Sequence, residues 1–492
     1  MWNPLRNLRN LFTRTTTRVV NRTVRAHYDN AQTGPGNAKH WADADELGPI
    51  SSNTYAVRAT LRKRARLERD NNPHLNALVK TWGHNFIGTG PRLQLQLGES
   101  GYESGRLVEQ SFAAWAKSID LAEKLRLMAE VRPIDGAAFG IMFDNPATPN
   151  PIKMDIRVLE DEQVTTPELQ YQFNSTAVDG MELDAYGNPT FYHVLKEHPG
   201  DGIAWGGMGD YDRVPAKFVL HWFRPSRPGQ MRGVCELASS IGVGAQSRRY
   251  SAAVLTKAEV AANIAGVMET DTPADNGDAI TTEIMEEIDF PRGALLTLPG
   301  GYKAKTFDNG NTTTGFGEYL AVQHSTLGRP LLMPRNLVTG DSSDFNFASG
   351  KIDQLPFYQS IWIERNRLAA RVLDPLFKAW YVEARGVGLI PEDLPALNEW
   401  VWDWHWDGFA SIDPVKDATA IEKRMALNLT TLSEECAADG KNWRDVIDQK
   451  AIERAYMRSK GIDPDAGMNP AAPPPQEAAD PAQVQQDEGA NV

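Results

Sequence analysis

The chain has 492 residues, of which 41% are hydrophobic and 23% are charged, and its formal net charge at pH 7 is −13. This length allows two to four domains, and no apolar run approaches the ~20 residues of a transmembrane helix. The negative charge argues against an ordinary DNA-binding protein, whose affinity comes from neutralising phosphates. Two cysteines, Cys235 and Cys436, make a disulfide framework or a zinc site unlikely and fit a reducing cytoplasm.

The two ends of the chain carry opposite charge. Six arginines precede the first acidic residue, and residues 1–50 are predicted to form a flexible basic arm, which either meets an acidic surface or is simply solvated. Residues 461–492 hold six acidic residues, no basic residue and many Ala, Pro and Gln, so this tail should be disordered.

Residues 51–223 combine helices with strands. Helical patterns come first, at residues 55–71, 75–86, 107–119 and 122–132, with one alternating strand at 91–97. The period then changes to two, which predicts strands at residues 139–143, 154–159, 180–183, 190–195 and 217–223. The sequence D-A-Y-G-N-P at 184–189 is typical of a hairpin turn. An antiparallel sheet region between helical regions predicts the α+β class.

Residues 221–234, H-W-F-R-P-S-R-P-G-Q-M-R-G-V, are the most distinctive stretch of the chain. Three arginines, Arg224, Arg227 and Arg232, lie among two prolines and two glycines, so a defined turn is expected rather than a mobile loop. Such a turn could bind phosphate, but it holds no nucleophile, base or metal-ligand set. A structural junction is the preferred interpretation, with ordinary surface charges as the alternative.

A long helix is predicted at residues 236–268, with Ala, Ser and Gly on most of its faces. Because a surface helix of a monomer should have one apolar stripe and one charged face, this composition predicts close neighbours on both sides. Further elements are expected in chain order: short strands at 294–298 and 303–307, a helix at 318–328, a long polar loop at 334–350, a helix at 351–385 kinked at Pro375, and helices after Asp413, at 433–438 and at 443–459.

The sharpest candidate for chemistry is W-V-W-D-W-H-W-D at residues 400–407. Asp403, His405 and Asp407 alternate along one face of a predicted strand, and such a set can bind Mn, Fe or Zn. An edge strand that packs its tryptophans on one face is the more probable interpretation, and a carbohydrate platform has no paired carboxylates to support it. Residues 339–349 contain no nucleophile elbow, and Gly88-Thr89-Gly90 is not a nucleotide-binding fingerprint. We therefore predict no enzymatic activity, no cofactor and no metal.

Seven blocks, in order, resemble the lambda-type portal proteins of tailed bacteriophages. They are R-A-R-L-E-R-D-N-N-P (64–73), N-F-I-G-T-G-P-R-L-Q (85–94), F-A-A-W (112–115), D-G-A-A-F (135–139), G-M-E-L-D-A-Y-G-N-P (180–189), V-P-A-K-F-V-L-H-W-F-R-P-S-R-P-G-Q-M-R-G-V (214–234) and I-D-P-V-K-D-A-T-A (412–420). The resemblance covers roughly residues 50–455. One departure is N-F-A-S-G-K at 346–351, where the family often has N-Y-S-S-x-R.

The resemblance implies a ring, usually of twelve subunits, at one capsid vertex of a virion. Double-stranded DNA would be packaged and ejected through it, and the partners would be the terminase motor, a head-tail adaptor, the major capsid protein and a scaffold, with no membrane. A metal-dependent enzyme acting on nucleic acid or glycan through Asp403, His405 and Asp407 is the alternative. Another head component, such as an adaptor or scaffold, fits a 492-residue α+β chain less well.

The resemblance also divides the chain into parts. These are a wing (51–232), a first stem helix (233–268), a clip (269–314), a second stem helix (315–333), a tunnel loop (334–350), a long helix with the Trp-rich strand (351–412) and a crown (413–460). The residues expected at the DNA channel are Arg335, Asn336, Thr339, Asp341, Ser342, Ser343, Asp344, Asn346 and Lys351. Arg224, Arg227 and Arg232 are expected at the wing–stem junction, available to acids of a neighbouring subunit.

Overall fold

The structure is a computed structural model that describes residues 36, 38–97, 101–166, 177–201, 210–263, 267–270, 302–305, 315–343, 345–392, 394–409 and 413–464. The chain divides into two compact units, Met1–Ser52 and Asn53–Val492. All elements discussed below belong to the second unit. Within the described ranges, no helix combines the length and the apolar character that a bilayer span requires.

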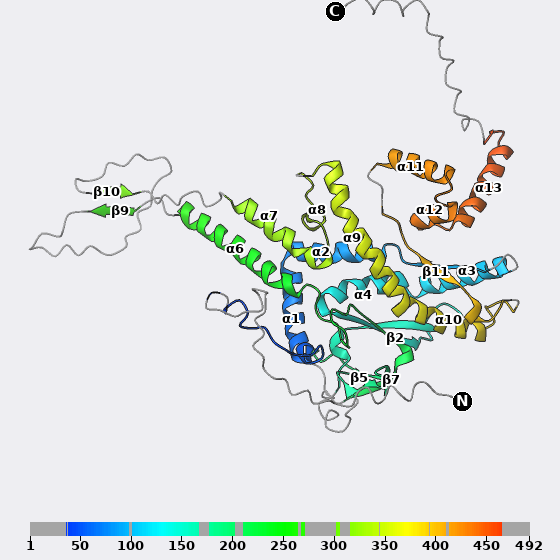
Figure 1. The fold of residues 1–492 in the computed structure, drawn as a ribbon, viewed down its shortest axis with the longest axis horizontal. Coiled ribbons are helices and arrows are strands. Elements are labelled where there is room, and N and C mark those ends of the chain that lie inside the picture. The colour runs from blue at the N-terminus through cyan, green and yellow to red at the C-terminus, as the bar shows by residue number, and fades with distance from the viewer. Residues whose placement is uncertain are drawn as a thin grey trace, which may run out of the picture. The chain divides into compact units, whose positions relative to one another are not determined.

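Helices make up most of the described structure (Figure 1). In chain order they are α1 (Tyr55–Asn71), α2 (Pro73–Ile87), α3 (Tyr102–Ser118), α4 (Leu121–Asp135), α6 (Ala238–Asn263), α7 (Phe316–Leu327), α8 (Arg335–Thr339), α9 (Phe347–Leu368), α10 (Asp374–Gly386), α11 (Pro414–Ala426), α12 (Leu432–Ala438) and α13 (Trp443–Ser459). The α1–α2 boundary lies at Asn72-Pro73, where Asn72 caps α2 by accepting from His74 N (3.1 Å) and Pro73 occupies the first helical position.

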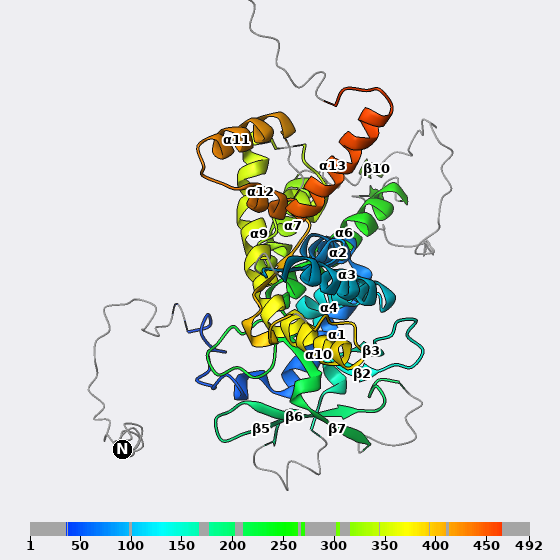
Figure 2. The ribbon, with the colours of Figure 1, turned by 90° about the vertical axis from the view of Figure 1, so that its right-hand side faces the viewer.

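The strands form four small sheets, and every described pair is antiparallel. β2 (Ala137–Asp144) lies between β3 (Met154–Leu159) and β8 (Val219–Phe223). The largest sheet has the order β4-β5-β6-β7 and lies at the lower edge of Figure 2; its strands are Ala177–Val178, Met181–Leu183, Pro189–Leu195 and Tyr211–Pro215. β1 (Arg92–Leu95) pairs with β11 (Trp402–His405), and β9 (Val267–Thr270) with β10 (Tyr302–Lys305). This mixture confirms the predicted α+β class.

Strand β2 separates two hydrophobic clusters. Ala138 and Met142 face the larger one, which contains the fully buried Trp82, Trp115, Trp222 and Trp380. Phe139, on the opposite face of the same strand, packs in the smaller cluster with residues of β3, β5 and β6. β2 is therefore buried on both faces and ties the helices to the four-stranded sheet.

The predicted long helix is α6, and α7 runs beside it in the opposite direction (Figure 1). Ser240 Oγ donates to Leu327 O (3.0 Å), and the Tyr250 ring lies 5.6 Å from that of Phe316 and 4.8 Å from that of Tyr319, so α7 runs beside the first half of α6. The prediction was wrong about the length of this helix, because β9 begins at Val267. The strand expected at 294–298 lies outside the described residues.

The helix expected at 351–385 starts four residues earlier and is interrupted differently. α9 begins at Phe347, and a π-helical turn, Ala369–Leu373, separates it from α10. Pro375 lies in the first turn of α10, where its missing N–H is tolerated. We had predicted a kink at Pro375 itself, whereas the irregular backbone is the π-helical turn Ala369–Leu373, which precedes Pro375.

Candidate functional site

The arginine turn (residues 224–233) is held by one buried side chain. Gln230 Oε1 accepts hydrogen bonds from Ser226 N (2.8 Å) and Arg227 N (3.2 Å), and Gln230 Nε2 donates to Arg232 O (2.7 Å). Gly229 has a φ of 77°, which non-glycine residues rarely adopt. The turn is therefore well defined, as its prolines and glycines predict.

The end of the turn packs directly on the end of α4. A Cβ atom on Gly233 would collide with Gly136 O, so only glycine allows this approach of two backbones. Beyond it, Glu236 N donates to Pro133 O (3.0 Å), and Cys235 Sγ donates to the same oxygen (3.4 Å). Burial raises the pKa of the Cys235 thiol to about 12, so this thiol stays protonated. The path from β8 into α6 is thus fixed by α4.

Arg232 is buried inside the subunit. Its guanidinium donates to Val164 O (2.9 Å), Asp179 O (2.6 Å) and Asp161 O (3.0 Å), and pairs with Asp161 Oδ1 (2.6 Å). It also lies 5.0 Å from the ring centroid of Phe139. The prediction that Arg232 offers its charge to a neighbouring subunit is therefore wrong, since only 2% of the residue is exposed.

Three arginines of α1, Arg58, Arg62 and Arg66, complete this buried network. Arg62 Nη1 lies 2.6 Å from Asp161 Oδ2, and Arg62 Nε lies 2.6 Å from Glu162 Oε1. Burial by itself would raise the pKa of Asp161, but Arg232, Arg58 and Arg62 together hold that pKa below its usual value. We had not predicted this cluster. Its sequence signal is the four-residue spacing of the arginines, which places them on one helix face.

Arg224 and Arg227 remain at the surface of the arginine turn. The Arg224 side chain is 41% exposed and lies 3.9 Å from a carboxylate oxygen of Glu236 and 3.7 Å from one of Glu364. Both carboxylates also pair with Arg132, whose side chain is fully buried (2.8 and 2.6 Å). Arg227 is exposed. Of the three arginines predicted at the junction, these two can meet another molecule.

The segment 334–350 is more ordered than the long loop we predicted. Its first part is helix α8, which contains Arg335, Asn336 and Thr339, with Asn336 buried. A short helix of five residues has no periodic sequence signal, which explains why the prediction missed it.

An exposed turn follows α8. Asp341, Ser342 and Ser343 are exposed, and Ser343 N donates to Asp341 Oδ1 (2.9 Å). Asn346 caps α9 by accepting from Ser349 N (2.8 Å), and Lys351, already inside α9, lies 3.4 Å from Asp417. The predicted Asp344 lies outside the described residues. The described residues of the predicted tunnel loop that follow α8 and are exposed are therefore 340–343 and Asn346.

The Trp-rich segment is a packing element in the described structure. Trp402 Nε1 and Trp404 Nε1 both donate to Asp374 Oδ1 (2.9 Å each), and β11 pairs only with β1 among the described strands. This arrangement confirms the edge-strand interpretation, with the tryptophans packed on one face.

The predicted metal set of this segment does not converge on a common point. Asp407 instead accepts from Thr89 N (2.5 Å) and pairs with Arg92 (3.0 Å), while Asp403 accepts from Gln96 Nε2. The carboxylates of the set therefore bind neighbouring backbone and side chains. The metal-enzyme alternative loses its basis, because it required Asp403, His405 and Asp407 to share one ion.

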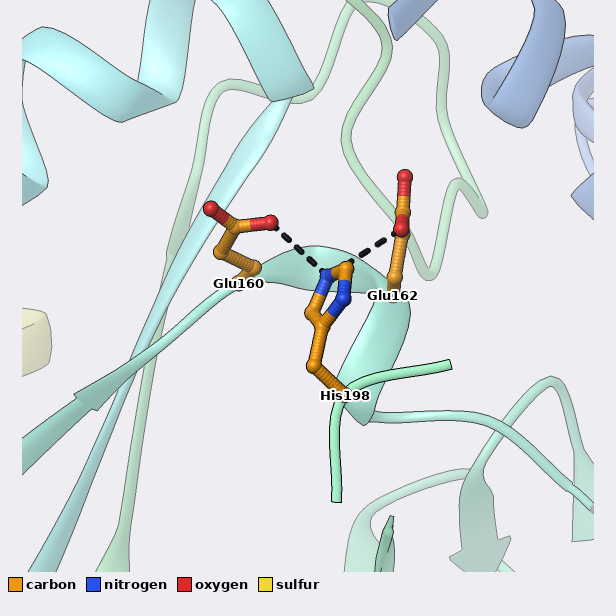
Figure 3. A group of neighbouring side chains, drawn as sticks. All are labelled: Glu160, Glu162 and His198. Carbon is orange, nitrogen blue, oxygen red and sulfur yellow. Dashed lines mark ion pairs between the residues drawn. The ribbon is translucent and has the colours of Figure 1, made fainter. Parts of the chain in front are cut away.

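Glu160, Glu162 and His198 form the one group in the described ranges whose potential ligand atoms lie within 4.8 Å of one another (Figure 3). His198 Nε2 lies 2.9 Å from Glu160 and 3.2 Å from Glu162, but Arg66 and Arg62 already pair with these carboxylates at 2.8 and 2.6 Å. His198 Nδ1 accepts from Gly200 N, so Nε2 carries the proton of the neutral ring. The group is therefore better described as an ion-pair cluster than as a metal site.

Comparisons with known proteins agree on one family. Residues 39–365 match the family model described as "Phage portal protein, lambda family". A protein described as "Probable portal protein", from Halomonas phage phiHAP-1, is 26% identical over 480 residues, which cover 91% of this chain and 88% of that protein.

Solved structures with similar folds come from gene transfer agent (GTA) particles. A chain from the neck of an empty GTA particle is 14% identical, with a TM-score of 0.48 over 78% of this chain and 93% of that one. A chain from the virion of a native particle has a TM-score of 0.46 over 78% of this chain and 93% of its own length, at the same identity. The family model covers about two thirds of the sequence and matches the resemblance carried by the seven blocks, so the chain belongs to the lambda family of phage portal proteins.

Proposed function

We propose that copies of this portal protein close into a ring, usually of twelve, at one capsid vertex of the virion. Double-stranded DNA would enter through the ring, driven by a separate terminase motor, and leave through it after a head-tail adaptor has bound. Contacts with the major capsid protein and a scaffold complete the proposed partners. The protein itself performs no chemistry in this proposal, and no cofactor, metal or membrane is involved.

The observation that carries this proposal is the composition and exposure of α6. Half of its 26 residues are Ala, Ser or Gly, and only four are charged. Among the described elements, α7 and α1 pack against α6. Arg248 of α6 pairs with Glu68 of α1 (2.6 Å). Leu255 of α6 and Val322 of α7 are 61% and 63% exposed. Small and apolar residues on uncovered faces favour close side-by-side packing with other copies, and head-to-tail contacts that close make a ring.

The charge of the chain is also consistent with a conduit for DNA. A net charge of −13 per copy provides no strong phosphate-binding surface, so a duplex could slide without being trapped. The exposed residues Asp341, Ser342 and Ser343 form the proposed DNA-facing segment. The exposed Arg224 and Arg227 are the proposed contacts with acids of a neighbouring copy.

Native mass spectrometry and negative-stain imaging of the full chain test the ring directly. Rings with a central channel are expected, and monomers or dimers at every salt concentration would refute the proposal. Replacing Arg224 and Arg227 by alanine should weaken assembly while changing the free energy of monomer unfolding by less than about 1 kcal/mol, because both residues are exposed. Unchanged assembly would make them ordinary surface charges.

The exposed turn has its own test. Deleting Asp341, Ser342 and Ser343 leaves the buried Val338 and the α9 cap Asn346 in place, so rings should form normally. Packaging or retention of DNA should then be impaired. Particles that fill and hold their genome normally would show that this turn does not act on DNA.

A further inference from the structure

The Trp-rich strand β11 has one free edge. Gln96 N donates to Val401 O (2.7 Å), and in an antiparallel pair such hydrogen-bonded positions recur at every second residue. The backbone groups of Asp403 therefore face β1, whereas the N–H and C=O groups of Trp402 and Trp404 point to the opposite edge. No described residue forms a hydrogen bond with these four outward backbone groups.

The two edges of this small sheet differ. The outward N–H of Leu95, on the far edge of β1, donates to Glu109 Oε1 of α3 (2.6 Å). Unpaired N–H and C=O groups along a strand edge are a template for pairing with another chain segment. The edge formed by β1 is thus covered within the subunit, whereas the edge formed by β11 can accept an additional strand.

A groove of about 430 Å³ runs along the free edge of β11. Its lining includes the consecutive residues 400–404. Because successive side chains of a strand point to opposite faces, such a lining follows the edge of the strand rather than one face. The other wall includes Ala369 and Ala370 of the π-helical turn, whose small side chains leave room for a backbone. The groove can therefore hold an extended segment beside β11.

The chemistry of the groove favours a basic segment. The two ionisable side chains in its lining, Asp374 and Asp403, are both acidic, and Asp403 is exposed. Most of the other lining side chains are tryptophans, whose rings attract cations. Lys378 already lies 5.8 Å from the ring centroid of Trp402, so positive charge can approach these rings. A segment with several arginines would complement this groove.

Residues 11–25 of the same chain, L-F-T-R-T-T-T-R-V-V-N-R-T-V-R, have the required composition. Eight of these fifteen residues are Thr or Val, which favour strands, and none is Gly, Pro or acidic. In an extended conformation Arg14, Arg18 and Arg22 lie on one face. The opposite face, formed by the odd-numbered residues of 11–23, carries no charge. This sequence therefore suits a strand with one basic and one uncharged face.

We propose that residues 11–25 of the basic arm add as a strand to the free edge of β11 in their own subunit. Their backbone pairs with Trp402 and Trp404, their uncharged face packs against the tryptophans, and their arginine face lies beside Asp403. The 27 residues from 26 to 52 can span about 90 Å. This is several times the radius of gyration of about 22 Å expected for a compact unit of 440 residues, so the linker permits the contact. The proposal goes beyond the ring and does not depend on it.

Hydrogen exchange of single backbone amides in the full chain tests this contact. At low protein concentration, where the chain is monomeric, the amides of Trp402 and Trp404 should be protected. They should exchange at least about tenfold more slowly than in a chain that lacks residues 11–25. The amide of Asp403 faces β1 in both chains, so its exchange should change much less, which makes it an internal control.

A pair of variants separates strand pairing from the mere presence of the arm. Replacing Thr16 and Thr17 together by proline removes two adjacent backbone donors, so the protection should be lost in either register. The matched control replaces both threonines by alanine, which keeps both donors, and it should retain most of the protection. Both positions lie outside the unit that contains β11, so neither variant should change the fold of that unit.

Each other outcome has a definite meaning. Equal exchange of Trp402 and Trp404 with and without residues 11–25 overturns the proposal, and so does equal protection in the proline and alanine variants. Protection that appears only when copies assemble assigns this edge to another copy and also overturns it. Because the comparison is made on monomers, failure of this inference is distinguishable from failure of the proposed ring.

Discussion

Replacing Arg232 by methionine should destabilise the folded subunit rather than its assembly. Methionine preserves much of the apolar stem but removes the guanidinium, which leaves Val164 O, Asp179 O and Asp161 without these hydrogen bonds. Breaking one partner of a buried ion pair costs about 3–5 kcal/mol. Because Arg58 and Arg62 still neutralise Asp161, we expect a loss near the lower end, about 3 kcal/mol.

The measurement is the free energy of unfolding of the full chain in denaturant, at low protein concentration where it is monomeric. Arg227→Met is the matched control, because it removes an exposed guanidinium from the same turn and should change the unfolding free energy by less than about 0.5 kcal/mol. Pairing Arg232→Met with Asp161→Asn in a double-mutant cycle then measures the coupling between these two side chains.

A difference below about 1 kcal/mol between Arg232→Met and Arg227→Met would refute this reasoning. It would mean that the buried hydrogen bonds and ion pair of Arg232 contribute little to the stability of the folded subunit. An Arg232→Met chain that folds with wild-type stability but no longer assembles would restore the view that Arg232 serves the neighbouring copy.

Three further predictions concern single sites. Burial lowers the pKa of His221 well below its usual value and that of His324 to about 4, so the unfolded chain binds protons below about pH 6.5 that the folded chain does not. Stability should therefore fall as the pH drops from about 6.5 towards 4, and His221→Leu should reduce the loss between pH 7 and 5 by up to about 2 kcal/mol; identical pH profiles would contradict this. Gly233→Ala should cost about 3 kcal/mol or more in denaturant unfolding, because the new Cβ meets backbone, whereas Gly242→Ala, in the open part of α6, should stabilise the chain by about 0.5–1 kcal/mol. Asp407→Asn should cost about 1–2 kcal/mol through the weakened contacts with Thr89 and Arg92, and elemental analysis should find the same metal content in both proteins.

Helices and strands with strong local signals were predictable from the sequence. The bounds of α1, α13 and β3 match the predictions residue for residue, because periodicity and turn or cap residues mark both ends. Prediction failed where the local signal is weak or ends gradually. α8 is too short for a period, and apolar and small residues continue from the end of α6 to Met268, so the pattern did not mark that end.

The buried charges could not be predicted, and the reason is physical. A pattern of polar and apolar residues assigns every arginine to the surface, yet Arg58, Arg62, Arg132, Arg232 and Arg365 are all buried. Each is buried only because its partner comes from a distant part of the chain, as when Arg365 donates to Asn85 O and Phe86 O at the end of α2. Leu355 of α9 is the converse case, since a pattern of polar and apolar residues assigns leucine to the core and this one is 57% exposed.

The use of arginine at the turn between β8 and α6 has a consequence for the proposed ring. A buried ion pair adds little net stability compared with apolar side chains of the same volume, but its hydrogen bonds are directional. Arg232 bonds to three separate backbone oxygens, and Gly233 touches the end of α4, so the start of α6 has little freedom to change direction. In a closed ring every subunit must present its contact faces at the same angle, and small angular errors add up around the circle. A directional network at the base of α6 therefore suits a subunit whose geometry, more than its stability, decides whether the ring can close.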